Sequence, residues 1–255
     1  MDRTCLIPVL LLMLASCSVK EARDSCPCQV EIDLSAFAKV SRSVRIRVGA
    51  TRLGRSLTEV DSLQLQLQAV RQGALPVAVW SGLKTLEERG DTVWVPRGQM
   101  CDSLYIFSHK GDQPTGENLR LKAVPHKQFA TVFLTVQTAE GETPPKVITV
   151  RSDANGLSLP DGSPVDGTLE LPVSGDGRYL FRLPRQRSDN QLVVEMEGAD
   201  GKEQSYPLGE WIRESGFDWT AADLDDLVVG MDMSEWAVQV EVLPWEAGAP
   251  VWELF

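Results

Sequence analysis

Strict alternation of apolar and polar residues recurs along the chain in short segments. A period of two places every second side chain on the same face of a β-strand, so that one face is buried while the other meets water. Turn-forming sequences separate the segments, among them residues 154–156 (Ala-Asn-Gly) and 175–177 (Gly-Asp-Gly). Many short strands joined by turns are typical of β-sandwiches, so the pattern predicts an all-β fold. The clearest segments are residues 44–48, 63–67, 119–123 and 238–242.

One stretch departs from this alternation. Residues 208–215 (Leu-Gly-Glu-Trp-Ile-Arg-Glu-Ser) predict a short helix that Gly216 ends. Around Pro125, a second break separates two comparable blocks of predicted strands. We therefore expect an N-terminal β-sandwich over residues 26–125 and a C-terminal β-sandwich over residues 126–255, with the helix in the second.

The first residues have the pattern of a bacterial export signal. Arg3 is followed by an apolar run over residues 5–15, which is shorter than the roughly twenty residues of a transmembrane helix. A leucine and two small residues then precede Cys17, as in the lipobox of bacterial lipoproteins. We expect a signal peptide over residues 1–16, lipid on Cys17 and a lipidated tether over residues 17–25.

Charge and candidate chemistry narrow the possible functions. The net charge is −11, which argues against nucleic acid and anionic lipid as partners. The chain has two histidines and contains no nucleophile elbow, phosphate-binding loop or zinc-protease motif. We expect no enzymatic activity, no cofactor and no small-molecule substrate.

The remaining cysteines are candidates for a disulfide bond, because an exported protein folds in an oxidising compartment. Cys26, Cys28 and Cys101 are the candidates. Cys101 can join only one of the other two, and the sequence does not decide which. A metal site would need more ligands than these three residues supply.

A group of carboxylates near the C-terminus also requires an interpretation. Asp223, Asp225, Asp226 and Asp232 carry the hard oxygen ligands that calcium prefers. The glycine-punctuated loop that would bring such ligands together is missing. A helix cap followed by a solvated turn is therefore the favoured interpretation, and no metal is expected.

Three stretches resemble one family, the FimB-like fimbrial anchor lipoproteins of Bacteroidales. The first is residues 26–33, directly after the tether. The second is residues 183–186 (Leu-Pro-Arg-Gln) leading into residues 192–196. The third and most specific comprises residues 206–212, 215–219 and 223–226, then a strand and Pro244-Trp245. Trp211 and Phe217 stand where tyrosine-like residues are expected.

The resemblance implies two tandem transthyretin-like β-sandwiches and a structural role. The family's anchor subunits are held by lipid on the outer membrane, at the cell surface, and form the base on which fimbrillin subunits assemble. Assembly joins subunits by donor-strand exchange, in which an extended segment of one subunit completes a sheet of the next. The alternating segment Ala237–Leu243 is the candidate partner strand, with Ala237, Val238, Val240 and Val242 as its candidate residues.

A second interpretation stays open, that of a surface lipoprotein that captures glycans for an uptake system. Seven tryptophans are compatible with a glycan platform. Because most of them lie among aliphatic residues, packing in a core or at a domain interface is the favoured role for most.

Overall fold

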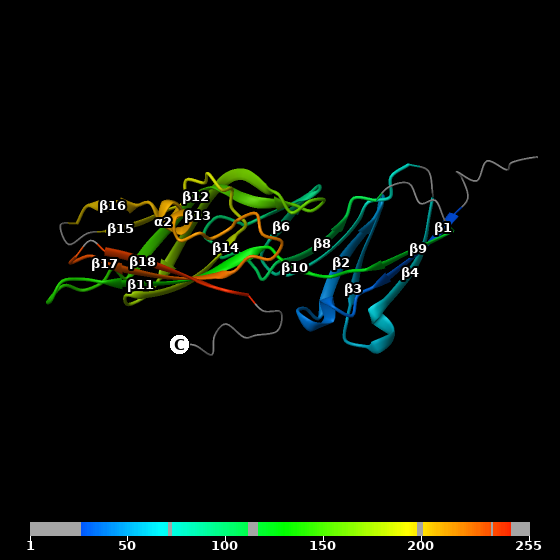
Figure 1. Cartoon of the computed structure of the whole chain (residues 1–255), viewed down its shortest axis with the longest axis horizontal. Coiled ribbons are helices and arrows are strands. Elements are labelled where there is room, and N and C mark those ends of the chain that lie inside the picture. Colours follow the sequence, from blue (N-terminus) through cyan, green and yellow to red (C-terminus); the bar gives the residue numbers. More distant parts are fainter. Residues whose placement is uncertain (1–26, 71–72, 112–116, 198–200, 236, 246–255) are drawn as a thin grey trace, which may run out of the picture.

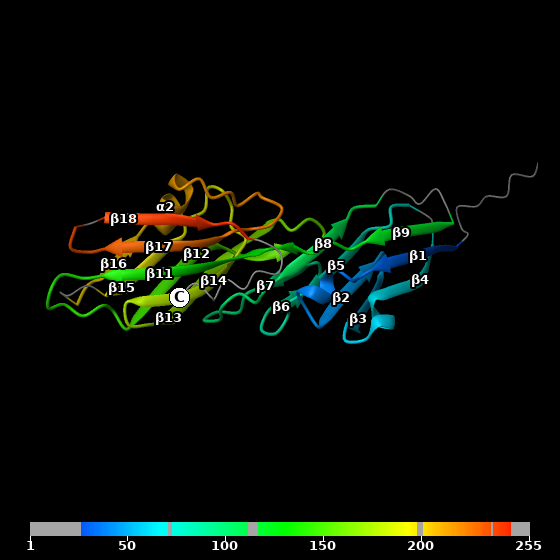
Figure 2. The ribbon, with the colours of Figure 1, turned by 60° about the horizontal axis from the view of Figure 1, so that its bottom comes forward.

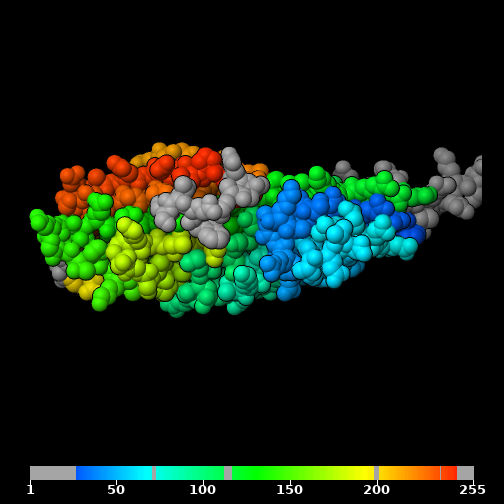
Figure 3. Space-filling model, turned by 90° about the horizontal axis from the view of Figure 1, so that it is seen from below, coloured from blue at the N-terminus to red at the C-terminus, as the bar shows by residue number. Residues whose placement is uncertain are grey.

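The structure, a computed structural model, describes residues 27–70, 73–111, 117–197, 201–235 and 237–245. Two pairs of sheets follow one another along the long axis of an elongated molecule (Figure 1). The N-terminal half, blue and cyan in Figure 3, occupies one end and the C-terminal half the other. The all-β fold with a short helix is confirmed. Within the described residues, no helix has the length and apolar character needed to cross a bilayer.

The N-terminal pair of sheets encloses a core of aliphatic side chains. Val30, Ile32, Ile46 and Val79 meet there from both sheets, and Phe37 is fully buried with them. One sheet has the order β4 (Gln64–Val70), β1 (Pro27–Asp33) and β9 (Asn118–Lys122). The other has the order β10 (His126–Lys127), β8 (Tyr105–His109), β5 (Val77–Ser81), β2 (Ser43–Val48) and β3 (Thr51–Ser56). Single turns of 3-10 helix occupy Phe37–Lys39 and Val60–Leu63.

The C-terminal pair of sheets encloses a larger core. One sheet has the order β14 (Arg178–Pro184), β11 (Phe129–Gln137), β17 (Asp226–Asp232) and β18 (Ala237–Leu243). The other has the order β16 (Glu203–Tyr206), β15 (Val193–Glu197), β12 (Val147–Ser158), β7 (Thr92–Trp94) and β6 (Glu87–Arg89), and β13 (Pro164–Ser174) pairs with β12.

Strands cross between the two halves of the chain. The hairpin β6–β7 comes before Pro125 in the sequence, yet β7 pairs with β12. Conversely, β10 follows Pro125 and pairs with β8. Each half thus contributes to a sheet of the other, which ties them together. The boundary between residues 125 and 126 remains a prediction.

The four alternating segments and the helix lie where the sequence predicts them. The segments fall in β2, β4, β9 and β18, and the helix α2 spans Leu208–Glu214. Gly216 ends the helical region in the left-handed conformation, with φ of 83°. Leu208 and Ile212 bury one face of α2 against the C-terminal core.

The predicted turn at residues 154–156 is wrong, because β12 runs straight through it. The register with β13 shifts between Ser152 and Ala154 and again between Ala154 and Gly156. Gly156 is needed there for close packing: an added Cβ would lie 2.5 Å from the carbonyl oxygen of Val93 in β7. The glycine therefore lets β7 approach β12.

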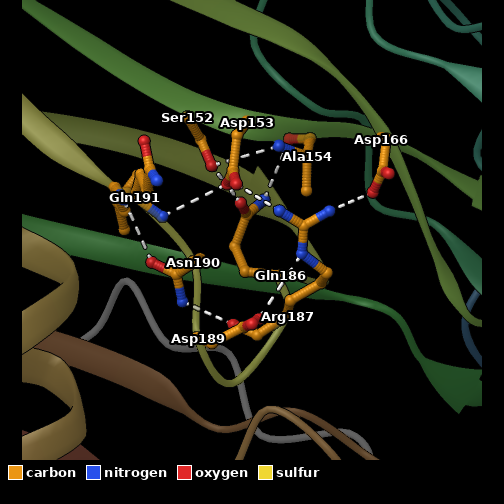
Figure 4. A network of polar contacts seen from close by, with 10 residues as sticks. Ser152, Asp153, Ala154, Asp166, Gln186, Arg187, Asp189, Asn190 and Gln191 are labelled. Carbon is orange, nitrogen blue, oxygen red and sulfur yellow. Dashed lines mark hydrogen bonds and ion pairs between the residues drawn. The ribbon is translucent and has the colours of Figure 1, made fainter.

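β12 pairs with β15 along one part of its length and with β7 along another. Between these two parts, the loop after β14 takes the place of a neighbouring strand (Figure 4). Ser152 donates its hydroxyl to Oε1 of Gln186, and Nε2 of Gln186 donates to the carbonyl oxygen of Ala154 at 3.4 Å. Arg187 pairs with Asp153 and Asp166 on either side. This loop network satisfies polar groups of the irregular part of β12.

Candidate subunit-docking site

The strand β18 forms the edge of its sheet. It pairs antiparallel with β17, from Asp226 opposite Leu243 to Asp232 opposite Ala237. Figure 2 shows β11, β17 and β18 side by side. Among the described residues, no strand pairs with the outer side of β18. The edge thus offers the main-chain N–H and C=O groups that a further strand needs for pairing.

The side chains of β18 divide between its two faces. Val238, Val240 and Val242 are half-buried and pack against the C-terminal core. Gln239 and Glu241 point to the exposed face, together with Ala237. The alternation seen in the sequence therefore fixes β18 on the core through three small aliphatic residues.

A hollow of about 200 Å³ lies beside this strand on the outer face of the sheet. Thr135 of β11, Gly230 of β17 and Gln239 of β18 stand in one row across it. A Cβ added at Gly230 would meet no atom within 4 Å. The main chain of β17 is therefore uncovered next to the edge.

A buried ion pair ties the start of β17 to the junction between the two sandwiches. Lys127 and Asp226 are each 1% exposed, and Nζ of Lys127 donates to Oδ1 of Asp226 at 2.7 Å. The ammonium also donates to the carbonyl oxygen of Leu224 at 3.0 Å. The main-chain N–H of Thr131 donates to the same carboxylate oxygen at 2.5 Å. A buried charge requires such partners, and this pair links β10, β11 and β17.

The pKa of Lys127 is lowered, because burial outweighs the opposing influence of Asp226. Aromatic rings surround the ammonium, with the centroid of Phe129 at 4.9 Å and that of Trp245 at 6.0 Å. Tyr105 contacts both rings, at centroid distances of 5.6 Å and 6.2 Å. Burial raises the pKa of Tyr105. The end of β18 thereby reaches the junction through Trp245.

The solvated turn that the sequence favoured is wrong for Asp223, Asp225 and Asp226. Asp226 is buried with Lys127, and Asp225 accepts the main-chain N–H of Trp245 at 2.8 Å. Asp223 accepts the main-chain N–H of Lys127 at 2.7 Å and lies 3.1 Å from Nδ1 of His126. Asp232 caps the turn before β18 through Ser234. Within the described residues, no group of three or more potential metal ligands forms.

The other predicted site residues are the cysteines Cys17, Cys26, Cys28 and Cys101. Cys17 and Cys26 are outside the described residues. Cys28 and Cys101 are both buried and free. A Cys28–Cys101 disulfide is therefore not formed: Cys28 belongs to β1 in the N-terminal sandwich, whereas Cys101 belongs to the C-terminal core.

The sequence did not identify the Lys127–Asp226 pair. Lys127 follows a histidine in a segment that the alternation leaves unassigned, and its partner is 99 positions away. The one signal in the sequence was the position of Asp226 at the start of an apolar run. A carboxylate that is buried there needs a hydrogen-bond donor or a cation as its partner.

Comparison with known proteins gives similarity in fold. The chain matches no known family model and no curated protein sequence at a significant level. Among solved structures, the fimbrial anchor protein Mfa2 of Porphyromonas gingivalis is similar at 11% identity and a TM-score of 0.59, over 87% of this chain and 99% of that one. A proposed polysaccharide-binding protein of Bacteroides thetaiotaomicron has 10% identity and a TM-score of 0.60, over 84% and 95% of the two chains. A proposed adhesin of the same species has 12% identity and a TM-score of 0.56, over the same shares. At such identities these similarities show a shared fold along nearly the whole length of each relative.

Proposed function

We propose that this protein is the base subunit of a fimbria, held on the outer membrane by lipid on Cys17 and joined to fimbrillin subunits through β18. The observation that carries the proposal is the open edge of β18, in the half of the molecule away from β1 (Figure 1). The proposed tether precedes β1. Lipid attachment and subunit docking would therefore occupy different halves of an elongated body.

Strand addition suits this edge physically. Main-chain hydrogen bonds supply affinity and alternate side-chain positions supply specificity. The edge strand β3 carries Arg52 and Arg55, and such charges discourage pairing between edges. β18 carries a single charged residue, Glu241, on its exposed face. The similarity in fold to the anchor protein Mfa2 supports the same role.

Two chromosomal variants test the two parts of the proposal separately. Cys17→Ala should release the protein from the outer membrane. Truncation after Ser234 removes β18 but retains all of β17, and it should leave the protein membrane-bound on cells without attached fibres. Electron microscopy of fibres and fractionation of membranes give the readouts. Val60→Ala, which changes only an exposed side chain outside β18, is the control. Firmly attached fibres on the truncated protein would contradict docking through β18.

A second candidate function is glycan capture by a surface lipoprotein of an uptake system. The similarity in fold to a proposed polysaccharide-binding protein favours it. Adjacent genes for outer-membrane transporters, instead of fimbrillin-like lipoproteins, would support this candidate. Trp80 and Trp219 do not form a glycan platform, because both are buried.

A further inference from the structure

A cleft of about 550 Å³ lies where the two sandwiches meet. Ser108 and Gln128 line it from the junction, Asp161 and Ser163 from the turn between β12 and β13, and Arg185 and Ala222 from two loops of the C-terminal half. This volume is within the range of small-molecule sites, roughly 300–1,000 Å³. None of these side chains belongs to the β18 edge.

The guanidinium of Arg185 is the unusual group in this cleft. Arg185 is 7% exposed, and its three nitrogens donate to neutral oxygens. Nε donates to Oε1 of Gln128 at 2.9 Å, Nη2 to the carbonyl oxygen of Ala222 at 3.2 Å and Nη1 to that of Trp219. In the described part of the chain, no carboxylate forms an ion pair with Arg185, although the two other buried cations, Lys127 and Arg47, have Asp226 and Asp91.

The nearby carboxylates are engaged elsewhere. Asp218 accepts the N–H and hydroxyl of Thr220. Asp223 accepts the main-chain N–H of Lys127 and contacts Nδ1 of the His126 ring. Both favour the charged form of Arg185, but burial still lowers its pKa. An arginine stays protonated in proteins, so its positive charge persists. A buried charge with only neutral partners is costly, and an anion in the cleft would offset that cost.

We propose that the cleft binds a sugar acid, with its carboxylate at Arg185 and its hydroxyls at the polar side of the cleft. A guanidinium has five N–H donors, and three hydrogen bonds account for only part of them. Oδ1 of Asp161 accepts from Ser163 at 2.8 Å, and this carboxylate, which lines the cleft, can accept a further hydrogen bond from a ligand hydroxyl. Ser108 and His126 add further polar groups to the wall. The inference is independent of docking through β18, and it gives a ligand class to the glycan-binding alternative.

Titration of the unlipidated Cys17→Ala chain with D-glucuronate tests the proposal. The indole N–H signal of Trp219, which lines the cleft, is followed by NMR and assigned with Trp219→Phe. Saturable shifts are expected with glucuronate. D-glucose, which lacks the carboxylate, should bind about tenfold more weakly or worse, because a hydrogen bond to a charged group is lost. Acetate has the carboxylate but lacks the sugar hydroxyls, and it should also bind more weakly than glucuronate.

Ala222→Trp should abolish binding by filling the cleft from an exposed position while it leaves the main-chain clamp on Arg185 in place. Ala38→Trp, an exposed site in the N-terminal half, is the matched control and should bind normally. Equal affinity for glucose would overturn recognition of the carboxylate, and equal affinity for acetate would show an adventitious ion only. Unchanged binding by Ala222→Trp would show that the ligand binds outside this cleft. Fibre attachment should be normal in Ala222→Trp, so failure here is separable from failure of the anchor proposal.

Discussion

Nζ of Lys127 lies 2.7 Å from Oδ1 of Asp226, and the two side chains join the strand at the interdomain junction to the strand beside the docking edge. Trp245, just beyond β18, stands over the same ammonium. The candidate docking edge and the junction are therefore parts of one packed unit.

Removing one partner of this pair should destabilise the protein strongly. Asp226→Ala leaves the buried ammonium unpaired, and we expect a loss of about 3 kcal/mol or more in the free energy of unfolding. The double variant Lys127→Met/Asp226→Leu should lose clearly less, because no charge remains buried. Urea denaturation measures both. Glu241→Ala is the exposed control, with a change within about 0.5 kcal/mol. Equal losses in the single and double variants would contradict this account.

Trp245 should hold the end of β18 in place. In Trp245→Ala, the contacts of the ring with Tyr105 and Lys127 are lost. We expect faster hydrogen exchange of the amides of β18, since among the described residues β17 is its one hydrogen-bonded neighbour, and unchanged exchange in β2. Val60→Ala, at a side chain exposed to solvent, serves as the control and should alter neither strand. Unchanged exchange of β18 in Trp245→Ala would show that the strand is held by β17 and the core alone.

A disulfide between β17 and β18 separates two modes of docking. Gly230 and Gln239 are directly opposite, so cysteines at both positions have Cβ atoms about 5 Å apart. If a partner strand adds to the outer side of β18, oxidised and reduced cells should keep their fibres equally. Loss of fibres only after oxidation would mean that β18 must leave its sheet during docking.

In the loop network beside β12, the amide of Gln186 should contribute more to the stability of the protein than the guanidinium of Arg187. Gln186→Leu leaves the hydroxyl of Ser152 and two carbonyl oxygens without their partner. We expect a loss of roughly 1–3 kcal/mol in the free energy of unfolding. Arg187→Ala removes surface ion pairs and should cost about 1 kcal/mol or less. A larger loss for Arg187→Ala, by thermal or urea unfolding, would reverse this ranking.

The stability of the protein should fall at alkaline pH partly through Cys101. Burial raises the pKa of this thiol well above its ordinary value of 9.0. The folded state therefore keeps the proton while the unfolded state loses it above about pH 9, so the contribution is complete below pH 9 and declines as the pH rises. Cys101→Ala should show a shallower decline in urea unfolding between pH 8 and pH 11. Burial also raises the pKa of Tyr105, so a smaller decline should remain. An identical pH profile would exclude the thiol as a cause.

Local pattern determined much of this protein. The alternating segments gave the strands β2, β4, β9 and β18, because a period of two is enough to set which face of a strand is buried. The helix α2 and its end at Gly216 followed from equally local signals. The position of β18 at a sheet edge did not follow, since edge and central strands can share one pattern.

Only the tertiary structure decided the long-range relationships. Residues 154–156 have the composition of a turn, but the approach of β7 keeps Gly156 in a strand. Asp226 looked like part of a solvated turn, and the burial of Lys127 made it the partner of a charge. Arg185 came to line a cleft because two segments far apart in the chain, one at Gln128 and one at residues 219–222, converge on it. These outcomes depend on which surfaces pack against each other. The packing of the whole core determines this, and no short sequence pattern does.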